Sequence, residues 1–320
     1  MTGSGIKWKK GILPLNQILL FSIIFFLPVV LPSYFGWTAG MLAVPVFCAL
    51  SFNGVPAGKN VVIVSLILVG LVALARQQAS AFLFSINAVP LGFVLFHSTQ
   101  AGKTAARSGL EGTGIMLIIW LLFWSVFNAV TGIDLYQQIL DTMNSALEQT
   151  KEVSSSQEAG LAPEMVLGIA QAVTAMQETV PKMLPGLLLS LLLTTVWLNM
   201  VIINSLMTRI TGTPPWGIYS TWKLPEHLVW LPAGAIAAML LTQGTLQQIG
   251  FWMAMIAGLL YFFQGLAVLM TLLTRWRVPP FIKTVLYLVC LLNTYGLLLL
   301  TSLGLLDVWF NLRKIPKDGT

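Results

Sequence analysis

Charged residues are scarce in this sequence of 320 residues, because Asp, Glu, Lys and Arg together make up only 9% of it. An ordinary soluble domain carries about 25% charged residues. This chain is instead 57% hydrophobic. The scarcity of charge excludes an ordinary soluble globular protein and points to an apolar environment for most of the chain.

Cysteine and histidine are also nearly absent, with two of each: Cys48, Cys290, His97 and His227. Both cysteines lie inside apolar runs without C-x-x-C spacing, which argues against a disulfide framework and a cysteine metal site. Neither histidine belongs to a ligand pattern, and the chain has no P-loop, nucleophile elbow or dinucleotide-binding fingerprint. We therefore predict no enzyme activity, no catalytic residues, no cofactor and no metal site.

Long apolar runs are what the sequence does have. Several windows of 18 or more residues carry no charge, and each is long enough to cross about 30 Å of hydrocarbon as a helix. The runs lack the alternation of a membrane β-barrel. We predict an all-α, polytopic helical membrane bundle with nine transmembrane helices, or eight. The nine segments are 13–33, 36–52, 60–76, 80–97, 110–131, 183–207, 228–243, 249–274 and 284–306.

The positions of the basic residues predict the orientation, since short cytoplasmic loops carry an excess of Lys and Arg. Lys7, Lys9 and Lys10 precede the first segment, and no cleavage site follows it, so a retained first span is expected. The pattern predicts a membrane protein with a cytoplasmic N-terminus. Eight and nine spans leave the same excess of basic residues inside, so the side of the C-terminus stays open.

Residues 132–182 differ from the rest because they hold most of the chain's acidic residues. Apolar residues recur there with helical spacing, first from Ile133 to Leu147 and again from Val166 to Val180. We predict an extracytoplasmic hairpin of two amphipathic helices, whose stripes pack on each other, on the bilayer surface or on a partner. The expected domains are 1–131, 132–182 and 183–320.

Neutral amides within the apolar segments are the candidates for an intramembrane polar site. Amides in a bundle commonly hydrogen-bond between helices, each contributing roughly 0.6 kcal/mol. The alternative is a substrate site, and Asn87 is favoured for it because Pro90 and Gly92 follow nearby. The candidates are Asn87, Asn128, Asn199 and Gln264.

The end of the chain, GLLDVWFNLRK, places Asp307, Arg313 and Lys314 directly after an apolar run. One interpretation is a membrane exit in which the two basic side chains extend to lipid head groups. In the other, Asp307 pairs with a base such as Arg313, or this tail docks a partner. Arg275 and Arg277 form a second possible docking site for a partner or anionic lipid. Segment 213–230, rich in tryptophan, is expected to lie along the cytoplasmic surface.

Several stretches together resemble the YybS-like family of uncharacterised bacterial membrane proteins. They are GKTAAR at 102–107, YFFQGLAVL at 261–269 and LGLLDVWFNLRK at 303–314. That family is distantly similar to the substrate-binding membrane subunits of energy-coupling-factor transporters. The resemblance implies a multi-pass protein of the bacterial inner membrane and is compatible with transport.

Two functional classes follow from these observations. The first is a non-enzymatic scaffold or accessory subunit of a membrane complex, with a protein partner bound through residues 132–182 or the cytoplasmic loops. The alternative is a transport component for a small solute or lipid substrate, with a neutral polar intramembrane site. Membrane lipids are expected partners and nucleic acid is not, because the basic residues fit topology better. The oligomeric state is open.

Overall fold

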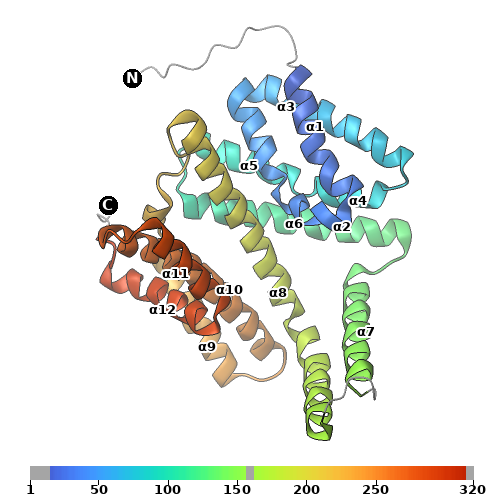
Figure 1. The fold of residues 1–320 in the computed structure, drawn as a ribbon, viewed down its shortest axis with the longest axis vertical. Coiled ribbons are helices and arrows are strands. Elements are labelled where there is room, and N and C mark those ends of the chain that lie inside the picture. The colour runs from blue at the N-terminus through green and yellow to red at the C-terminus, as the bar shows by residue number, and fades with distance from the viewer. Residues whose placement is uncertain (1–14, 156–161, 315–320) are drawn as a thin grey trace.

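The computed structural model describes residues 15–155 and 162–314, and these contain helices and no strand (Figure 1). In chain order the elements are α1 (Leu15–Val30), α2 (Pro32–Phe35), η1 (Gly36–Met41), α3 (Ala43–Ala75), α4 (Ala79–Ile86), α5 (Val89–Gln100), α6 (Ala105–Thr131), α7 (Leu135–Ser155), α8 (Pro163–Thr211), η3 (Tyr219–Thr221), η4 (Glu226–Val229), α9 (Trp230–Leu241), α10 (Thr245–Arg275), α11 (Pro280–Leu292) and α12 (Thr294–Phe310).

The all-α prediction is confirmed for the described residues, but the count of nine spans, or eight, is not. Five helical segments are long and apolar enough to cross a membrane, and two bent helix pairs raise the number to as many as seven. The five are Ala43–Ala75, Ala79–Gln100, Ala105–Thr131, Pro163–Thr211 and Thr245–Arg275. Each bent pair turns by about a right angle, 101° after α1 and 102° between α11 and α12. Sequence periodicity does not reveal such bends.

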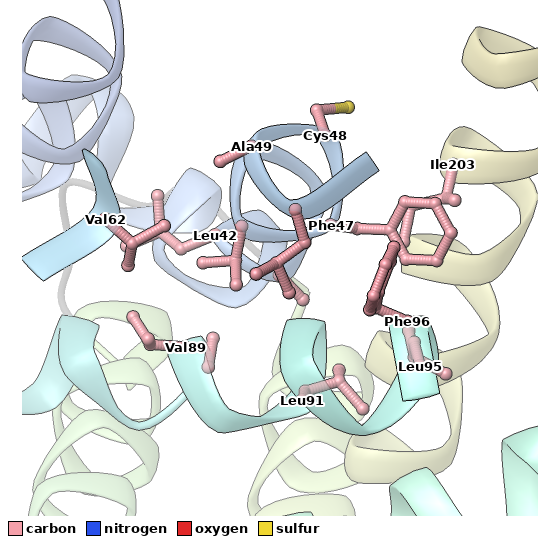
Figure 2. Packing of buried hydrophobic residues seen from close by; sticks show 14 of the residues in the cluster. Leu42, Phe47, Cys48, Ala49, Val62, Val89, Leu91, Leu95, Phe96 and Ile203 are labelled. Carbon is pink, nitrogen blue, oxygen red and sulfur yellow. The ribbon is translucent and has the colours of Figure 1, made fainter. Parts of the chain in front are cut away.

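The N-terminal helices pack around one apolar core that also takes in the C-terminal half of α8. Phe47 of α3 and Phe96 of α5 meet edge to face at 5.7 Å between ring centroids. Figure 2 shows these two rings lying together beside Ile203 of α8. All three side chains are at most 5% exposed. Because α8 contributes to this core, it ties the N-terminal helices to the rest of the molecule.

Helix α3 consists of two helical halves that meet at Gly54. Gly54 has φ +74° and ψ 167°, which only glycine adopts readily. The halves touch, since a Cβ on Gly58 would lie 2.6 Å from the carbonyl oxygen of Ala49. The break expected between segments 36–52 and 60–76 is therefore present, but it consists of this one non-helical residue and not of a loop.

Helix α8 is a single element of 49 residues. At 1.5 Å per residue it is about 74 Å long. It begins beside α7, in the part of the molecule that projects away from the other helices in Figure 1, and ends in the N-terminal core. Pro181 and Pro185 lie within it and do not end it. The expected boundary between residues 182 and 183 thus falls inside one helix.

The C-terminal helices α8, α10 and α12 run in the same direction. Trp252 near the start of α10 donates from Nε1 to Lys182 O of α8 at 2.7 Å. Phe263, further along α10, stacks on Trp197, further along α8. Thr301 of α12 likewise contacts the first half of α10, and Asp307 contacts Gln264 in the second half. Helix α9 therefore returns the chain from the end of α8 to the start of α10, and α11 returns it from the end of α10 to the start of α12.

The expected span at 284–306 is not one straight helix, because the chain bends at Asn293 and forms α11 and α12. Asn293 has an extended backbone, and its side-chain oxygen accepts from Tyr295 N at 2.9 Å, which caps the new helix. Gly296 then passes close to the backbone of Cys290. An asparagine N-cap followed by a small residue was the sequence signal for this bend. As a result, α10 and α12 end on the same side of the molecule.

One end of the molecule collects most of the basic residues. At this end an open groove of about 760 Å³ brings together Gly54 of α3, His97 of α5 and Thr211 of α8. The ends of α10 and α12 also lie here, since both contact Ser220. We call it the cationic end, and its Lys and Arg residues are Lys59, Lys103, Arg107, Arg209, Lys223, Arg275, Arg277, Lys283, Arg313 and Lys314.

The remaining basic residues of the described ranges are Arg76, Lys151 and Lys182. They lie after α3 or in the projecting helices α7 and α8. Most described acidic residues also lie in the projecting part, between positions 134 and 178. The two ends of the molecule therefore carry opposite net charge.

Candidate functional site

A buried ion pair lies between Asp307, in the last turn of α12, and Arg313. Asp307 Oδ2 accepts from Arg313 Nη2 at 2.7 Å and from Nε at 2.9 Å. Both side chains are almost fully buried, at 2% and 1% exposure. Asn311 adopts the left-handed conformation that ends the helix, and the chain turns so that Arg313 points back toward Asp307. Arg313 therefore does not extend to lipid head groups, and that sequence-based interpretation is wrong for this residue.

The pair connects three separate parts of the chain. Arg313 Nη1 donates to the carbonyl oxygens of Ser220 at 2.8 Å and Trp222 at 2.7 Å. Gln264 of α10 donates to Asp307 Oδ2 at 3.1 Å and accepts from Leu224 N at 3.1 Å. We call Gln264, Asp307 and Arg313 the buried polar cluster. Its two charges offset each other, and the carbonyls bound by Arg313 fix the segment 219–224 against α10 and α12.

Segment 213–230 is exposed at residues such as Ile218 and Trp230, and it is also anchored to the helices at several points. Trp216 is 8% exposed, and its Nε1 donates to Ser108 Oγ at 2.9 Å. Asn204 of α8 accepts from Trp216 N and donates to Gly217 O. Tyr219 donates from its hydroxyl to Phe263 O at 2.7 Å. Burial raises the pKa of this hydroxyl, so it stays a donor.

An apolar cavity of about 80 Å³ lies beside the buried polar cluster, and it is partly open to the outside of the molecule. Helices α6, α8 and α10 and the segment 219–224 form its wall. Trp197 and Phe263 stack in this wall at 4.2 Å between ring centroids and 3° between planes. The wall includes Gly109, Leu110, Thr113, Trp197, Tyr219, Trp222, Lys223, Phe263 and Gln264.

The four amides singled out from the sequence do not come together in one site. Asn87 bonds only to Leu83 O and Phe84 O of its own helix, and Asn128 is exposed near the end of α6. Asn199 is fully buried and donates to Gly40 O of η1 at 2.7 Å, so it joins two elements. Gln264 alone lines the cavity. The structure therefore does not bring these four amides together in one intramembrane site.

The suggested docking residues also separate into two groups. Asp307 and Arg313 are buried, whereas Lys314, Arg275 and Arg277 are exposed at the cationic end. Sequence reasoning missed Ser108, which holds Trp216, and the pair of Trp197 and Phe263. Nothing in the spacing of these residues indicates contact, because their partners are distant in the chain.

The projecting part consists of α7 and the beginning of α8. Tyr136 donates from its hydroxyl to Pro181 O at 3.3 Å, and Gln177 Nε2 donates to Glu148 Oε1 at 3.0 Å. Val173 of the predicted stripe is buried, but Met165, Leu167 and Met176 are 50–60% exposed. Residues 156–161 between the helices lie outside the described part. That this pair is an extracytoplasmic hairpin stays a prediction.

Metal ligands are not grouped in the described ranges, since no three His, Cys, Asp or Glu residues lie close enough there to hold an ion. The described cysteines Cys48 and Cys290 are both free thiols.

Comparison with known protein families assigns the chain to one of them. A family model described as "Predicted membrane protein (DUF2232)" matches residues 19–308. The chain belongs to this family. The match covers the helices from α1 to α12, and the description supports a membrane protein without naming an activity. No curated protein and no solved structure matches the chain. The finer resemblance to YybS-like proteins, and through them to energy-coupling-factor transporter subunits, stays a prediction.

Proposed function

We propose that this DUF2232 protein is a non-enzymatic scaffold or accessory subunit of a complex in the bacterial inner membrane. The partner is a protein that docks on α7 and the first part of α8. The observation that carries the proposal is the continuity of α8 over 49 residues, from the projecting pair to the membrane core. A partner bound at one end of such a helix is held rigidly to the other.

The exposed residues of the projecting pair support a protein partner. Met165, Leu167 and Met176 are large apolar side chains at 50–60% exposure in the part of the chain that is poorest in apolar runs. Methionine is frequent at adaptable binding surfaces because its side chain is flexible and polarizable. The acidic residues around them favour a partner with basic groups at the rim of its binding surface.

The distribution of charge supports an orientation with the cationic end in the cytoplasm. All described Lys and Arg residues except Arg76, Lys151 and Lys182 belong to that end, as the positive-inside pattern requires. The bend at Asn293 adds Arg313 and Lys314 to it. In this orientation the C-terminus is cytoplasmic and the projecting pair is on the other side of the membrane.

Site-specific photo-crosslinking in living cells tests the scaffold. A photoreactive amino acid is placed at Met176, and the matched control is placed at Glu178, which is exposed on a different face of the same helix. We expect a protein adduct of defined mass from position 176 and none from 178. The adduct should disappear when Met165, which lies 11 residues away on the face of Met176, is replaced by serine. It should persist when Leu167, which lies on the face of Glu178, is replaced by serine.

Equal adducts from positions 176 and 178, or adducts with lipid alone, would contradict a protein-docking role. An adduct with a second copy of the chain would identify the surface as an oligomer interface and would also contradict a separate partner. Deleting a single turn from α7 should weaken the adduct without changing the amount of protein in the membrane.

A transport component for a small solute or lipid substrate is the second candidate, and the apolar cavity favours it. If the cavity holds a substrate, Gln264→Ala should impair the process that the complex carries out while the crosslink at Met176 is kept. The scaffold predicts the opposite: Gln264→Ala leaves function intact whenever the protein folds, and Met165→Ser abolishes it.

A further inference from the structure

Most polar side chains in the wall of the apolar cavity already have partners, and the exception is the buried indole N–H of Trp197. Gln264 uses its oxygen on Leu224 N and its nitrogen on Asp307. The Tyr219 hydroxyl donates to Phe263 O, and Trp222 Nε1 donates to Trp216 O at 3.1 Å. A polar ligand would lose its hydration here with little compensation. With one unpartnered donor in the wall, the part of a ligand that enters should be largely apolar.

The side of the cavity formed by α6 is in contact with the surroundings. Leu110 lines the cavity and is also 41% exposed. Helix α6 is one of the candidate membrane spans, so in a membrane an exposed leucine on it would be accessible to lipid chains. A hydrocarbon chain can enter through such an opening without crossing water. The volume of about 80 Å³ suits part of one chain and not a whole drug-sized molecule.

Basic residues lie next to the cavity. Lys223 is in the wall itself, and Lys103 and Arg107 flank the wall residues Ala105 and Ala106. Two acids pair with these three bases: Glu226 with Lys223, and Glu111 with both Lys103 and Arg107. One positive charge is left over, and the Arg107 side chain is 70% exposed. This excess favours an anionic head group.

We propose that the cavity binds one acyl chain of an anionic phospholipid from the leaflet at the cationic end. The head group lies against Lys103, Arg107 and Lys223. The chain fills the space between α6, α8 and α10, where it contacts the stacked rings of Trp197 and Phe263. This site is separate from the projecting pair that carries the proposed scaffold function, and either can fail without the other.

Lipid retention by the purified full-length protein tests the proposal. The protein is exchanged into detergent with phosphatidylglycerol or phosphatidylethanolamine, and bound lipid is counted by native mass spectrometry. Gly109→Leu places a side chain in the cavity. Gly114→Leu is the matched control, because a Cβ on Gly114 meets nothing within 4 Å and the residue is exposed on the same helix.

We expect wild type and Gly114→Leu to retain one phosphatidylglycerol, and Gly109→Leu to bind it about tenfold more weakly, which equals about 1.4 kcal/mol. If Gly109→Leu does not fold, Thr113→Leu serves instead, since Thr113 also lines the cavity. Retention by Gly109→Leu equal to that of Gly114→Leu overturns the acyl-chain site. Equal retention of the two lipids by wild type overturns the anionic preference, and Lys223→Gln should reduce that preference.

Discussion

At the scale of single residues, neighbouring basic side chains have opposite surroundings. Arg313 is buried, bonded to Asp307 and to two carbonyl oxygens, whereas Lys314 beside it is exposed. From the sequence the two are equivalent candidates for contact with head groups. They differ because the left-handed Asn311 ends α12 and turns Arg313 toward the protein. A buried charge is tolerated only when it is paired and hydrogen-bonded.

Replacing Arg313 with alanine should therefore destabilise the protein strongly. Asp307 would be left buried without its cation, and the carbonyls of Ser220 and Trp222 would lose their donor. Breaking a buried pair in this way costs about 3–5 kcal/mol. The free energy of unfolding in mixed micelles measures the change. Lys314→Ala is the control and should stay within about 0.5 kcal/mol of wild type. Equal effects of the two substitutions would show that Arg313 is not buried in solution.

Two glycines allow α10 and α12 to approach closely. A Cβ on Gly265 would overlap Leu300 O, and one on Gly304 would overlap Tyr261 O. Small residues at helix crossings are common in membrane proteins for this reason. Gly265→Ala and Gly304→Ala should each lower the unfolding free energy by about 1–3 kcal/mol or more, since overpacking forces the helices apart.

The control for this prediction lies on the same helix. Gly258 of α10 has nothing within 4 Å of an added Cβ. Gly258→Ala should be neutral or slightly stabilising, because alanine is the better helix former. The melting temperature of the three variants in one detergent separates close packing from a general effect of glycine replacement. A destabilised Gly258→Ala with unaffected Gly265→Ala would refute the arrangement.

At the scale of elements, the reversal within α3 depends on one backbone conformation. Gly54→Ala should cost about 1–3 kcal/mol, because the combination of φ +74° and ψ 167° is strained for any residue with a Cβ. Gly36→Ala is the comparison, with φ −56° and open space around its Cβ position, and it should have little effect. Thermal unfolding followed by the helical circular dichroism signal measures both.

Other elements show how far the local sequence specifies breaks. The predicted segments 36–52 and 60–76 leave a gap rich in glycine and proline, and the structure turns in this gap at Gly54. The hydropathy pattern does not indicate the bend at Asn293, because apolar residues continue on both sides of it. Prolines are not a reliable end signal in this chain, because Pro181 and Pro185 remain inside α8. Local signals mark where a helix is permitted to break, and tertiary contacts decide whether it does.

At the scale of the whole molecule, the segregation of charge makes a prediction about the proposed topology. Single cysteines are introduced at Gln243, between α9 and α10, and at Lys314, after α12, with the two native cysteines replaced. A membrane-impermeant thiol reagent should label Cys at position 243 in intact cells. It should label position 314 only after the membrane is permeabilised, because α10 and α12 end at the same side.

Labelling of position 314 in intact cells together with 243 would contradict this topology, and with it the reversal at Asn293. Labelling at 243 only after permeabilisation would invert the proposed orientation and leave the fold unchanged. A cysteine at the exposed Glu178 in the projecting pair gives an internal reference, since it should behave like position 243.

The sequence by itself determined the class of this protein. Low charge and long apolar runs require helices in a membrane, because an isolated backbone in hydrocarbon must satisfy its own hydrogen bonds. It also determined which loops are basic and which segment is acidic. These properties are local, so each can be read from neighbouring residues.

Only the tertiary structure decided which polar residues meet. Asp307 contacts Gln264, Gln264 contacts Leu224, and Arg313 contacts Ser220, across separations of 40 to 93 positions in the chain. The cavity beside them exists because α6, α8, α10 and the segment 219–224 meet without filling the space between them. Hydrophobic patterning selects the faces that pack, but it is too unspecific to choose the pairing, because many apolar faces fit one another about equally well.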